Sequence, residues 1–435
     1  MKLSLSRDHI KLLSKELSWV LIGQILAMCG SLILLRLLTE SLEPAEYGRF
    51  ALALTLVGLI NCLVMGGIVN GIGRFYPIAD DKNDVHSYLY ASFKLMSYTG
   101  SVALIAGLVA ILVLLWLDYA QWLSFLIVVI ALAITGGYNS FFNSIYNAAR
   151  KRNLFAAHIA LDPFIKVLLV IGLMQWFDIS AILVIICYVV SSLLILISQF
   201  FFLHRKYNVK TIFSIVSPKQ DWVKMIFIFS WPIMIWGVFG WAQNSAARWA
   251  LQVYGSIDDV GYYSVLSQIG YVPIQTLMGV FMTFLNPIIY GMAGDAQNIS
   301  RREKVNSLTN RISLLGIIIT AILTLFSFFF HYQIMNIFVA KEYLIISGYL
   351  PIMIASGGIF GIALVIAAKH LSFLSAKQIM PASIGSAIIG VIAAFTGVYF
   401  YSFVGVVYAG LVHSVSYLIL LLIVKKTWEI KNETH

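Results

Sequence analysis

The feature that most constrains this chain is a succession of long apolar stretches that fills nearly its whole length. Reading them against charged, Pro and Gly breaks predicts twelve helices, over residues 16–38, 47–73, 87–117, 120–149, 154–177, 179–203, 222–250, 259–291, 306–331, 343–370, 379–401 and 403–426. A helix needs about 20 apolar residues to cross a bilayer. Only 11% of the 435 residues are charged, against about 25% in soluble proteins. The sequence therefore predicts an all-α, polytopic membrane protein and excludes a soluble enzyme.

The charges between these stretches predict an orientation. The net charge of +10 would suggest a nucleic-acid partner in a soluble protein, but basic residues in loops also fix membrane topology. Alternate loops carry basic clusters such as Arg150-Lys151-Arg152, and the intervening loops carry acids such as Asp118 and Asp178. We therefore expect no nucleic-acid partner, and we expect both termini to be cytoplasmic.

Two signatures recur at nearly the same distance and predict a duplication. One is an arginine near the outer end of a helix, at Arg36 and Arg248, and the other is an acidic-x-Gly-x-aromatic turn around Gly48 and Gly261. A Gly-Gly pair also recurs in the fourth helix of each half, at 136–137 and 357–358. Chance similarity of apolar helices is the alternative, but the matching register favours two parallel six-helix repeats.

The duplication divides the chain into three parts. We expect an N-terminal six-helix lobe over 1–205, a cytoplasmic linker over 206–221 and a C-terminal six-helix lobe over 222–435. Parallel repeats of this kind are a transporter design, with the substrate between the halves. The chain has no phosphate-cradling Gly-x-x-x-x-Gly-Lys-Ser/Thr loop, and its three cysteines lack metal-ligand spacing. We expect no cofactor and no metal.

Ionisable residues inside a predicted span are candidates for a site, because a charge at the bilayer centre costs about 2.5 to 3.5 kcal/mol on insertion scales. Asp162 and Lys166 lie four residues apart and so share a helix face, with Pro163 between them. One interpretation is a self-neutralising pair that eases insertion. The other is a pair that faces a cavity, in which Lys166 meets an anionic headgroup.

The fourth predicted helix carries a row of asparagines, Asn139, Asn143 and Asn147, and ends near Arg150. An unsatisfied amide facing lipid would cost several kcal/mol, so these side chains face another helix or a wet cavity. Hydrogen bonding between helices and binding of sugar hydroxyls both remain open.

Three further arginines are candidates for substrate binding. Arg36 and Arg248 occupy equivalent positions in the two repeats, near the predicted outer ends of their helices, where basic residues are usually few. Either their side chains snorkel to the outer interface, or they form a cationic rim between the halves. Arg74 lies at the inner end of the second helix, where it is either an orientation signal or part of a cavity.

Several short motifs resemble the oligosaccharide flippases of the multidrug/oligosaccharidyl-lipid/polysaccharide exporter superfamily, which act in O-antigen and related polysaccharide synthesis. They are Arg36-Leu37-Leu38-Thr39, Pro44-Ala45-Glu46-Tyr47-Gly48, Gly66-Gly67, Arg74-Phe75-Tyr76 and Val260-Gly261-Tyr262-Tyr263. The likeness in length, span number and two-lobed layout covers essentially the whole chain. Carried over by position, Arg36, Arg74 and Arg248 match basic positions of that family.

The resemblance implies two six-helix bundles in a V shape around a cationic cavity. It also implies movement of an undecaprenyl-diphosphate-linked oligosaccharide from the cytoplasmic to the outer leaflet by alternating access, without bond chemistry. The partners would be this lipid-linked oligosaccharide and membrane lipid, with a polysaccharide polymerase and glycosyltransferases in the same process. Fixed guanidinium and ammonium groups suit a diphosphate, and amides suit sugar hydroxyls.

A peptidoglycan-precursor flippase remains open from the sequence, although that branch usually has two further helices. Two functions of other kinds remain open as well. A cation-coupled multidrug exporter of the same superfamily would need a buried carboxylate in an early helix, whereas Glu16 lies at the inner end of the first helix. In addition, Ala247 precedes Arg248 where the resembled family commonly has an acidic residue, which weakens the assumption that a proton or sodium ion binds there. A membrane glycan polymerase or ligase would be an enzyme, with acidic residues on sizeable outer loops. Asp258-Asp259 is the one outer acidic pair, and it also suits a helix N-terminus.

Overall fold

A computed structural model describes residues 7–207, 211–212, 221–294, 298–373 and 376–433. Most of the predicted linker, 206–221, and the basic residues Lys2, Lys210 and Lys219 lie outside the described residues. The described part is almost entirely helical and contains no strand.

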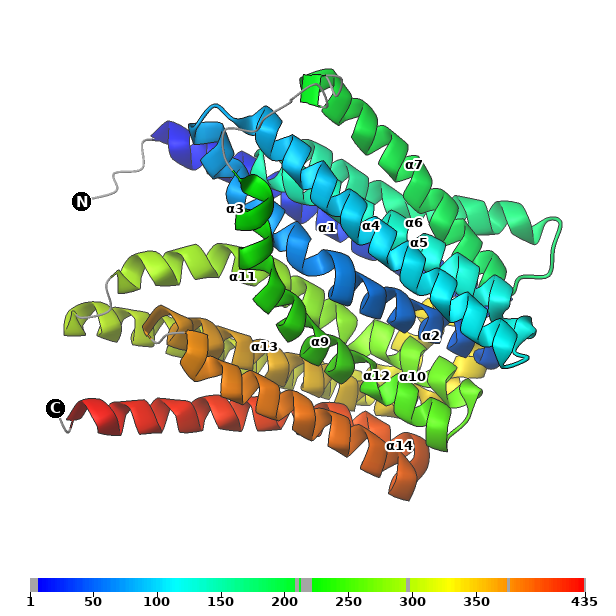
Figure 1. Cartoon of the computed structure of the whole chain (residues 1–435). Helices are drawn as coiled ribbons and strands as arrows, with labels where there is room; N and C mark the ends of the chain where they lie inside the picture. Colours follow the sequence, from blue (N-terminus) through cyan, green and yellow to red (C-terminus); the bar gives the residue numbers. More distant parts are fainter. Residues whose placement is uncertain (1–6, 208–210, 213–220, 295–297, 374–375, 434–435) are drawn as a thin grey trace. The chain divides into compact units, whose positions relative to one another are not determined.

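Helices follow one another with short connections (Figure 1). In the first half of the chain they are α1 (Arg7–Ser41), α2 (Pro44–Ile60), the π-helix η1 (Asn61–Gly66), α3 (Gly67–Asp81), α4 (Val85–Trp116), the short 3-10 helix η2 (Ala120–Trp122), α5 (Leu123–Ala148), α6 (Arg152–Met174) and α7 (Ala181–Tyr207). In the second half they are α9 (Trp222–Tyr254), α10 (Ile257–Gly270), α11 (Val272–Ala293), α12 (Ile299–Phe338), the 3-10 helix η3 (Lys341–Tyr349), α13 (Leu350–Phe373) and α14 (Ala376–Glu433).

Eleven stretches of the described chain are long and apolar enough to span a membrane. The last of them, Ile379–Ile423, holds two predicted helices and is broken at Ser402, whose φ of 50° is in the left-handed region. The prediction that one helix ends at 401 and the next begins at 403 agrees with this break. The eighth predicted span corresponds to α10 and α11 together. Because the last stretch holds two helices, the eleven stretches correspond to the twelve predicted spans. The all-α polytopic fold and the number of crossings are therefore confirmed.

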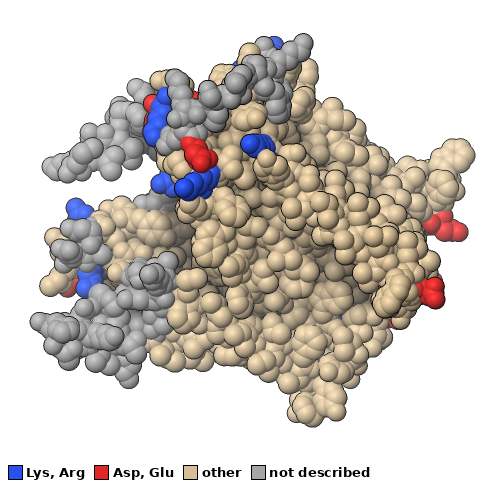
Figure 2. Space-filling model, in the orientation of Figure 1, with Lys and Arg blue, Asp and Glu red and all other residues tan. Residues whose placement is uncertain are grey.

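The surface shown in Figure 2 is mostly covered by residues other than Lys, Arg, Asp and Glu, and the charged side chains gather at its ends. Many large apolar side chains of the described helices lie on the surface, and Leu112, Leu168 and Ile197 are each more than half exposed. An apolar surface on this scale is incompatible with water around the molecule and fits a lipid environment. The chain is therefore a multi-pass membrane protein.

The chain forms two compact units, and the boundaries between them fall inside helices. The first contains Met1–Leu34 with Ala53–Trp241, and the second contains Leu35–Leu52 with Ala242–His435. The end of α1 and the start of α2 thus belong with the second unit, and the first half of α9 belongs with the first.

The core of the first unit lies among α3, α4, α5 and the start of α9. Tyr88, Phe141 and Trp222 are fully buried there. The Trp222 indole donates a hydrogen bond of 2.8 Å to Asp84, which satisfies the indole's only donor. This contact anchors the beginning of α9 in the first unit.

In the second unit, close backbone packing joins the start of α2 to α10. A Cβ on Gly48 would collide with the Ile257 carbonyl, and a Cβ on Gly261 would collide with the Pro44 carbonyl. Only glycine permits this approach. The two repeat-equivalent turns therefore pack directly against each other. Ser256 and Asp259 form a capping box at the start of α10, so the helix N-terminus interpretation of the outer acidic pair is confirmed.

Candidate functional site

In the first unit, Asp162 and Lys166 form a complete polar cluster between α6 and α7. The Lys166 ammonium lies 2.5 Å from an Asp162 carboxylate oxygen and 4.1 Å from the centre of the Tyr188 ring. The other Asp162 oxygen accepts a hydrogen bond of 2.8 Å from Ser191. The lysine side chain is only 15% exposed. Each charge is thus compensated within the unit, as in the self-neutralising interpretation.

Two members of the asparagine row connect α5 to α7. Asn139 donates to the Ser192 hydroxyl at 2.5 Å, and Asn143 accepts from the Gln199 amide at 3.0 Å. Gln199 is fully buried, and its backbone carbonyl accepts a hydrogen bond from the Tyr146 hydroxyl. These two asparagines therefore hold neighbouring helices together, whereas Asn147, one turn further along α5, is exposed.

Four polar residues of the neighbouring helices α3 and α5 are exposed, and we call them the polar strip: Asn70, Arg74, Ser140 and Asn147. The Ser144 hydroxyl of α5 donates to the Val69 carbonyl of α3 at 2.9 Å, so the two helices are in contact at this level. They are separated in sequence by α4 alone and so run parallel. Arg74 and Asn147 follow the contact by five and three residues, which places them at similar depth.

The members of this polar strip differ in their hydrogen bonding. Asn70 and Ser140 bond to carbonyls of their own helices, at 2.9 and 3.0 Å. The side chains of Arg74 and Asn147 have no polar partner among the described residues. Arg74 lies about 10 Å from the end of α3 at 1.5 Å per residue. Arg74 is an accessible cation in the stretch Pro44–Asp81, which is long and apolar enough to span a membrane.

Just upstream of α3, the helix contains one π-helical turn, η1. Such turns occur frequently at functional sites. The Asn61 amide of this turn bonds to the Val57 carbonyl at 3.1 Å, and its neighbour Met65 packs where Gly137 of α5 lacks a side chain. This irregular turn was not predicted, although it ends at the Gly66-Gly67 pair, and glycine weakens a helix.

Arg150 lies in the turn that follows α5 and not within the helix. Its φ is 55°, and the next residue, Lys151, donates its backbone N–H to the Tyr146 carbonyl at 2.8 Å. This is the helix-ending geometry in which glycine is usual. The side chain is exposed beside Arg152, which pairs with Glu16 at 3.8 Å.

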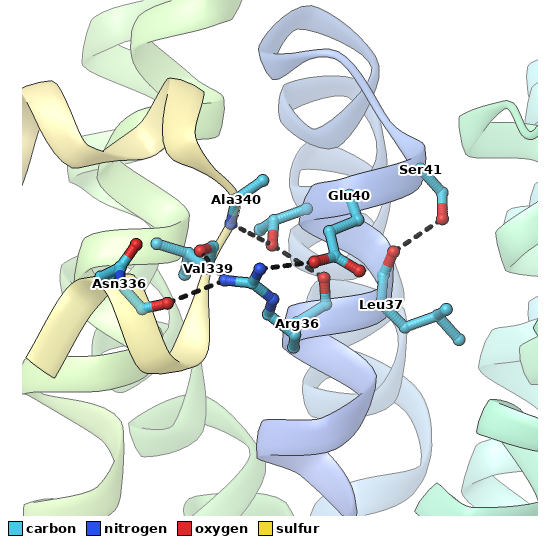
Figure 3. A network of polar contacts seen from close by, with 8 residues as sticks. Arg36, Leu37, Glu40, Ser41, Asn336, Val339 and Ala340 are labelled. Carbon is cyan, nitrogen blue, oxygen red and sulfur yellow. Dashed lines mark hydrogen bonds and ion pairs between the residues drawn. The ribbon is translucent and has the colours of Figure 1, made fainter.

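Arg36 binds the end of another helix in the second unit (Figure 3). Its guanidinium donates to the carbonyls of Asn336, at 2.9 Å, and Val339, and it pairs with Glu40 at 2.5 Å. The last carbonyls of a helix have no partner within that helix and carry partial negative charge. Arg36 therefore caps the C-terminus of α12.

The contact around Arg36 is extended by its neighbour Thr39. The Thr39 hydroxyl accepts the backbone N–H of Ala340 at 3.1 Å, and the Tyr343 hydroxyl donates to the Leu42 carbonyl at 3.4 Å. All these residues belong to the second unit. They explain why the end of α1 is part of that unit.

Arg248, the repeat-equivalent residue, bonds differently. It donates to the Ser264 hydroxyl at 2.9 Å and to the Asn244 carbonyl at 3.2 Å, and it lies 6.0 Å from the centre of the Tyr263 ring. Nearby, Gln243 and His413 contact each other at 3.0 Å. Arg248 thus links α9 to α10 inside the second unit.

Sequence reasoning missed the partners that α7 supplies. Ser191, Ser192 and Gln199 satisfy three of the candidate residues, yet they lie in a very apolar helix. The available signal was that Ser192 and Gln199 lie two helical turns apart and so share one face of α7.

The chain is similar in fold to several solved structures. The chain is similar to the inward-facing conformation of a multidrug resistance MATE family transporter of the MOP superfamily, with a TM-score of 0.69 and 15% identity over 94% of this chain and 96% of that one. It is equally similar to the lipid II flippase MurJ in an inward closed conformation, with a TM-score of 0.69 and 14% identity over 94% and 86%. A MOP superfamily transporter from Pyrococcus furiosus, described as having a binding pocket of reverse polarity, gives a TM-score of 0.65 at 15% identity over 96% and 95%. These likenesses confirm the fold.

A comparison with curated proteins finds no match. The family comparison is positive: residues 13–293 match the family described as polysaccharide biosynthesis protein. This match covers well over half of the chain and includes Arg36, the polar strip and Arg248. The protein therefore belongs to the polysaccharide biosynthesis protein family, within the MOP transporter fold.

Proposed function

We propose that this protein is a flippase for an undecaprenyl-diphosphate-linked oligosaccharide, which it moves from the cytoplasmic to the outer leaflet by alternating access. The product would enter surface polysaccharide synthesis. Family membership and the MOP fold support this proposal. The observation that carries it is the exposed polar strip of α3 and α5, in which Arg74 is accessible on a membrane-length helix.

The polar strip has the chemistry that a glycosyl diphosphate requires. A guanidinium binds phosphate oxygens with two parallel N–H donors, so Arg74 would receive the diphosphate. Amide and hydroxyl groups both donate and accept, so Asn70, Ser140 and Asn147 would bind sugar hydroxyls or water. The polyprenyl tail would remain in lipid while the headgroup moves.

We assign the other candidate residues to support of the site. Asn139, Asn143, Asp162 and Lys166 fix α5 and α6 against α7, while Arg36 and Arg248 hold helix contacts within the second unit. Arg150 belongs to the basic turn after α5. The substrate would therefore meet fewer fixed charges than the sequence suggested.

In this proposal the protein performs no bond chemistry and needs no cofactor. It would lie in the bacterial cytoplasmic membrane with both termini cytoplasmic, and would receive its substrate from glycosyltransferases and deliver it to a polysaccharide polymerase. Fusing a reporter active only in the cytoplasm to residue 435 tests the orientation, since activity supports it and silence of an expressed fusion contradicts it.

Purified protein in proteoliposomes tests the transport function. The probe is a polyprenyl-diphosphate-linked disaccharide with a fluorophore on the sugar, quenched from outside by a membrane-impermeant reductant. We expect complete quenching with the protein and about half without it. Quenching that stays near half with folded protein would contradict the proposal.

The same vesicles separate the other candidates. Growth or transfer of the glycan would indicate a polymerase or ligase. Uptake of a cationic dye driven by a proton or sodium gradient, with the glycolipid probe unmoved, would indicate a drug exporter. Neither result is expected, because the family and the exposed cation both favour an anionic, glycan-bearing substrate.

A further inference from the structure

A cavity of about 330 Å³ lies at one end of the first unit, between the turn after α5, the start of α6 and the end of α7. This volume is at the lower end of the range of about 300 to 1,000 Å³ for small-molecule sites. Its lining combines three cations, Lys151, Arg205 and Lys206, with Asn153 and Tyr207. None of these residues belongs to the polar strip.

The three cations of this cavity lack a carboxylate partner within ion-pair distance among the described residues, whereas the adjacent Arg152 is paired with Glu16. Lys151 and Lys206 repel each other, and Asp80 is the acid that attracts Lys206. The Lys206 ammonium also lies 4.5 Å from the centre of the Tyr207 ring. Like charges gathered around a cavity become favourable when an anion occupies it.

The start of α6 adds to the positive potential. This helix of 23 residues begins at Arg152 with no side-chain cap, so its first backbone N–H groups are free, and Asn153 and Leu154 of this first turn line the cavity. Uncapped helix N-termini bind phosphate groups through these donors and the helix dipole. Here the helix terminus and the three cations converge on the same space.

A simpler explanation accounts for only part of this arrangement. Basic residues in the last turn of α7 offset the dipole of that helix, and Arg205 and Lys206 lie there. Lys151 belongs to another turn, and a dipole effect requires neither a cavity nor a second helix that presents its N-terminus. Tyr146 and Tyr207 are of the type found where helices leave the bilayer.

We propose that this cavity binds the phosphate of a membrane lipid headgroup, at a site separate from the transport pathway. Basic pockets between membrane helices recognise anionic headgroups in this way. The phosphate could be supplied by an anionic phospholipid of the surrounding leaflet or by a polyprenyl diphosphate. The proposal rests on the first unit alone and does not depend on which substrate is transported.

Native mass spectrometry of the delipidated full-length protein tests the proposal. Phosphatidylglycerol is titrated against wild type and the triple variant Lys151→Gln/Arg205→Gln/Lys206→Gln. A matched control, Arg301→Gln/Arg302→Gln/Lys304→Gln, removes three cations from the start of α12 in the second unit. We expect the cavity variant to weaken the first binding event at least about tenfold, and the control less than about twofold, because each interfacial cation contributes about 1 kcal/mol.

The ligand arms identify the source of the phosphate. Undecaprenyl diphosphate that competes with phosphatidylglycerol and binds more tightly in wild type would assign the site to polyprenyl diphosphate. Absence of competition would assign it to resident phospholipid. Phosphatidylcholine, whose headgroup has no net charge, should bind equally to wild type and both variants.

Two results would overturn the proposal. One is unchanged phosphatidylglycerol binding in the cavity variant, and the other is an equal loss in both triple variants, which would indicate general charge attraction. Melting temperatures without added lipid must agree within about 2 °C. If the triple variant fails to fold, Lys151→Gln alone should weaken binding about fivefold, and unchanged binding by that single variant would contradict the proposal equally.

Discussion

The two compact units differ in the hydrogen bonding of their candidate arginines. In the first unit Arg74 is exposed on α3, with no polar partner for its side chain among the described residues. In the second unit Arg36 and Arg248 each donate to oxygen atoms of a neighbouring helix or turn. Arg36 and Arg248 use several of their five N–H donors to hold helices, whereas Arg74 uses none of its donors on a described residue. For this reason the proposed function places substrate binding in the first unit and helix anchoring in the second.

Two kinds of contact between helices can also be compared. In the first unit, side-chain bonds join α7 to its neighbours, as Ser191 with Asp162 of α6 and Gln199 with Asn143 of α5. In the second unit, α2 and α10 meet through bare backbone around Gly48 and Gly261. Substitutions at these two kinds of contact should therefore fail for different reasons, and four variants can separate them.

The largest effect is expected at the glycine contact of the second unit. Gly261→Val places a side chain against the Pro44 carbonyl, and backbone cannot move aside as a flexible side chain can. We expect the melting temperature to fall by at least about 5 °C, or folded protein to be lost, because overpacking costs about 1 to 3 kcal/mol or more. The control Gly279→Val faces open space and should melt within about 2 °C of wild type.

Arg36→Met should give the next largest effect. It leaves the Asn336 and Val339 carbonyls of α12 without their donor, and a lost hydrogen bond to a charged group costs about 1.5 to 3 kcal/mol. We expect a lower melting temperature in detergent, and faster hydrogen exchange at the end of α12 than in α5. Unchanged exchange at the end of α12 would show that Arg36 does not anchor it.

Asp162→Asn tests whether the charged pair of the first unit acts as a pair. It leaves the Lys166 ammonium uncompensated in a mostly buried position, so we expect a loss of about 1 to 2 kcal/mol in thermal stability. The double variant Asp162→Asn/Lys166→Met should recover most of that loss. Losses that simply add would show that the two residues do not depend on each other.

The smallest effect is expected at Gln199. Its amide nitrogen bonds to Asn143, but its side-chain oxygen is buried without a partner. Gln199→Met removes both the bond and the unsatisfied oxygen, and these changes oppose each other. We expect stability within about 0.5 kcal/mol of wild type. A large loss of stability in a thermal melt would show that the side-chain oxygen of Gln199 accepts a hydrogen bond in the membrane.

The sequence predicts the architecture well because apolar length and loop charge are local properties. The break between the last two helices was expected at residue 402, where Ser402 is kinked. The glycine signatures at 48 and 261 also predicted a repeat whose members the structure brings into contact.

The candidate site was harder to predict, because it depends on contacts between distant residues. Arg36 and Val339 are 303 positions apart, so no spacing rule connects them. The asparagine row had two open interpretations, and exposure separates Asn147 from Asn139 and Asn143 only once α7 is in place. The sequence supplied the right residue types, and packing decided which of them remain accessible.

The most direct test of this account compares Arg74→Gln with Arg36→Gln in the proteoliposome assay with the fluorescent glycolipid. Flipping rates are measured at equal amounts of folded protein, alongside melting temperatures. We predict that Arg74→Gln lowers the rate at least about tenfold, the loss of one charge-assisted contact, with an unchanged melting temperature. Arg36→Gln should lower the melting temperature. Full flipping activity in Arg74→Gln would contradict the assignment of substrate binding to the first unit.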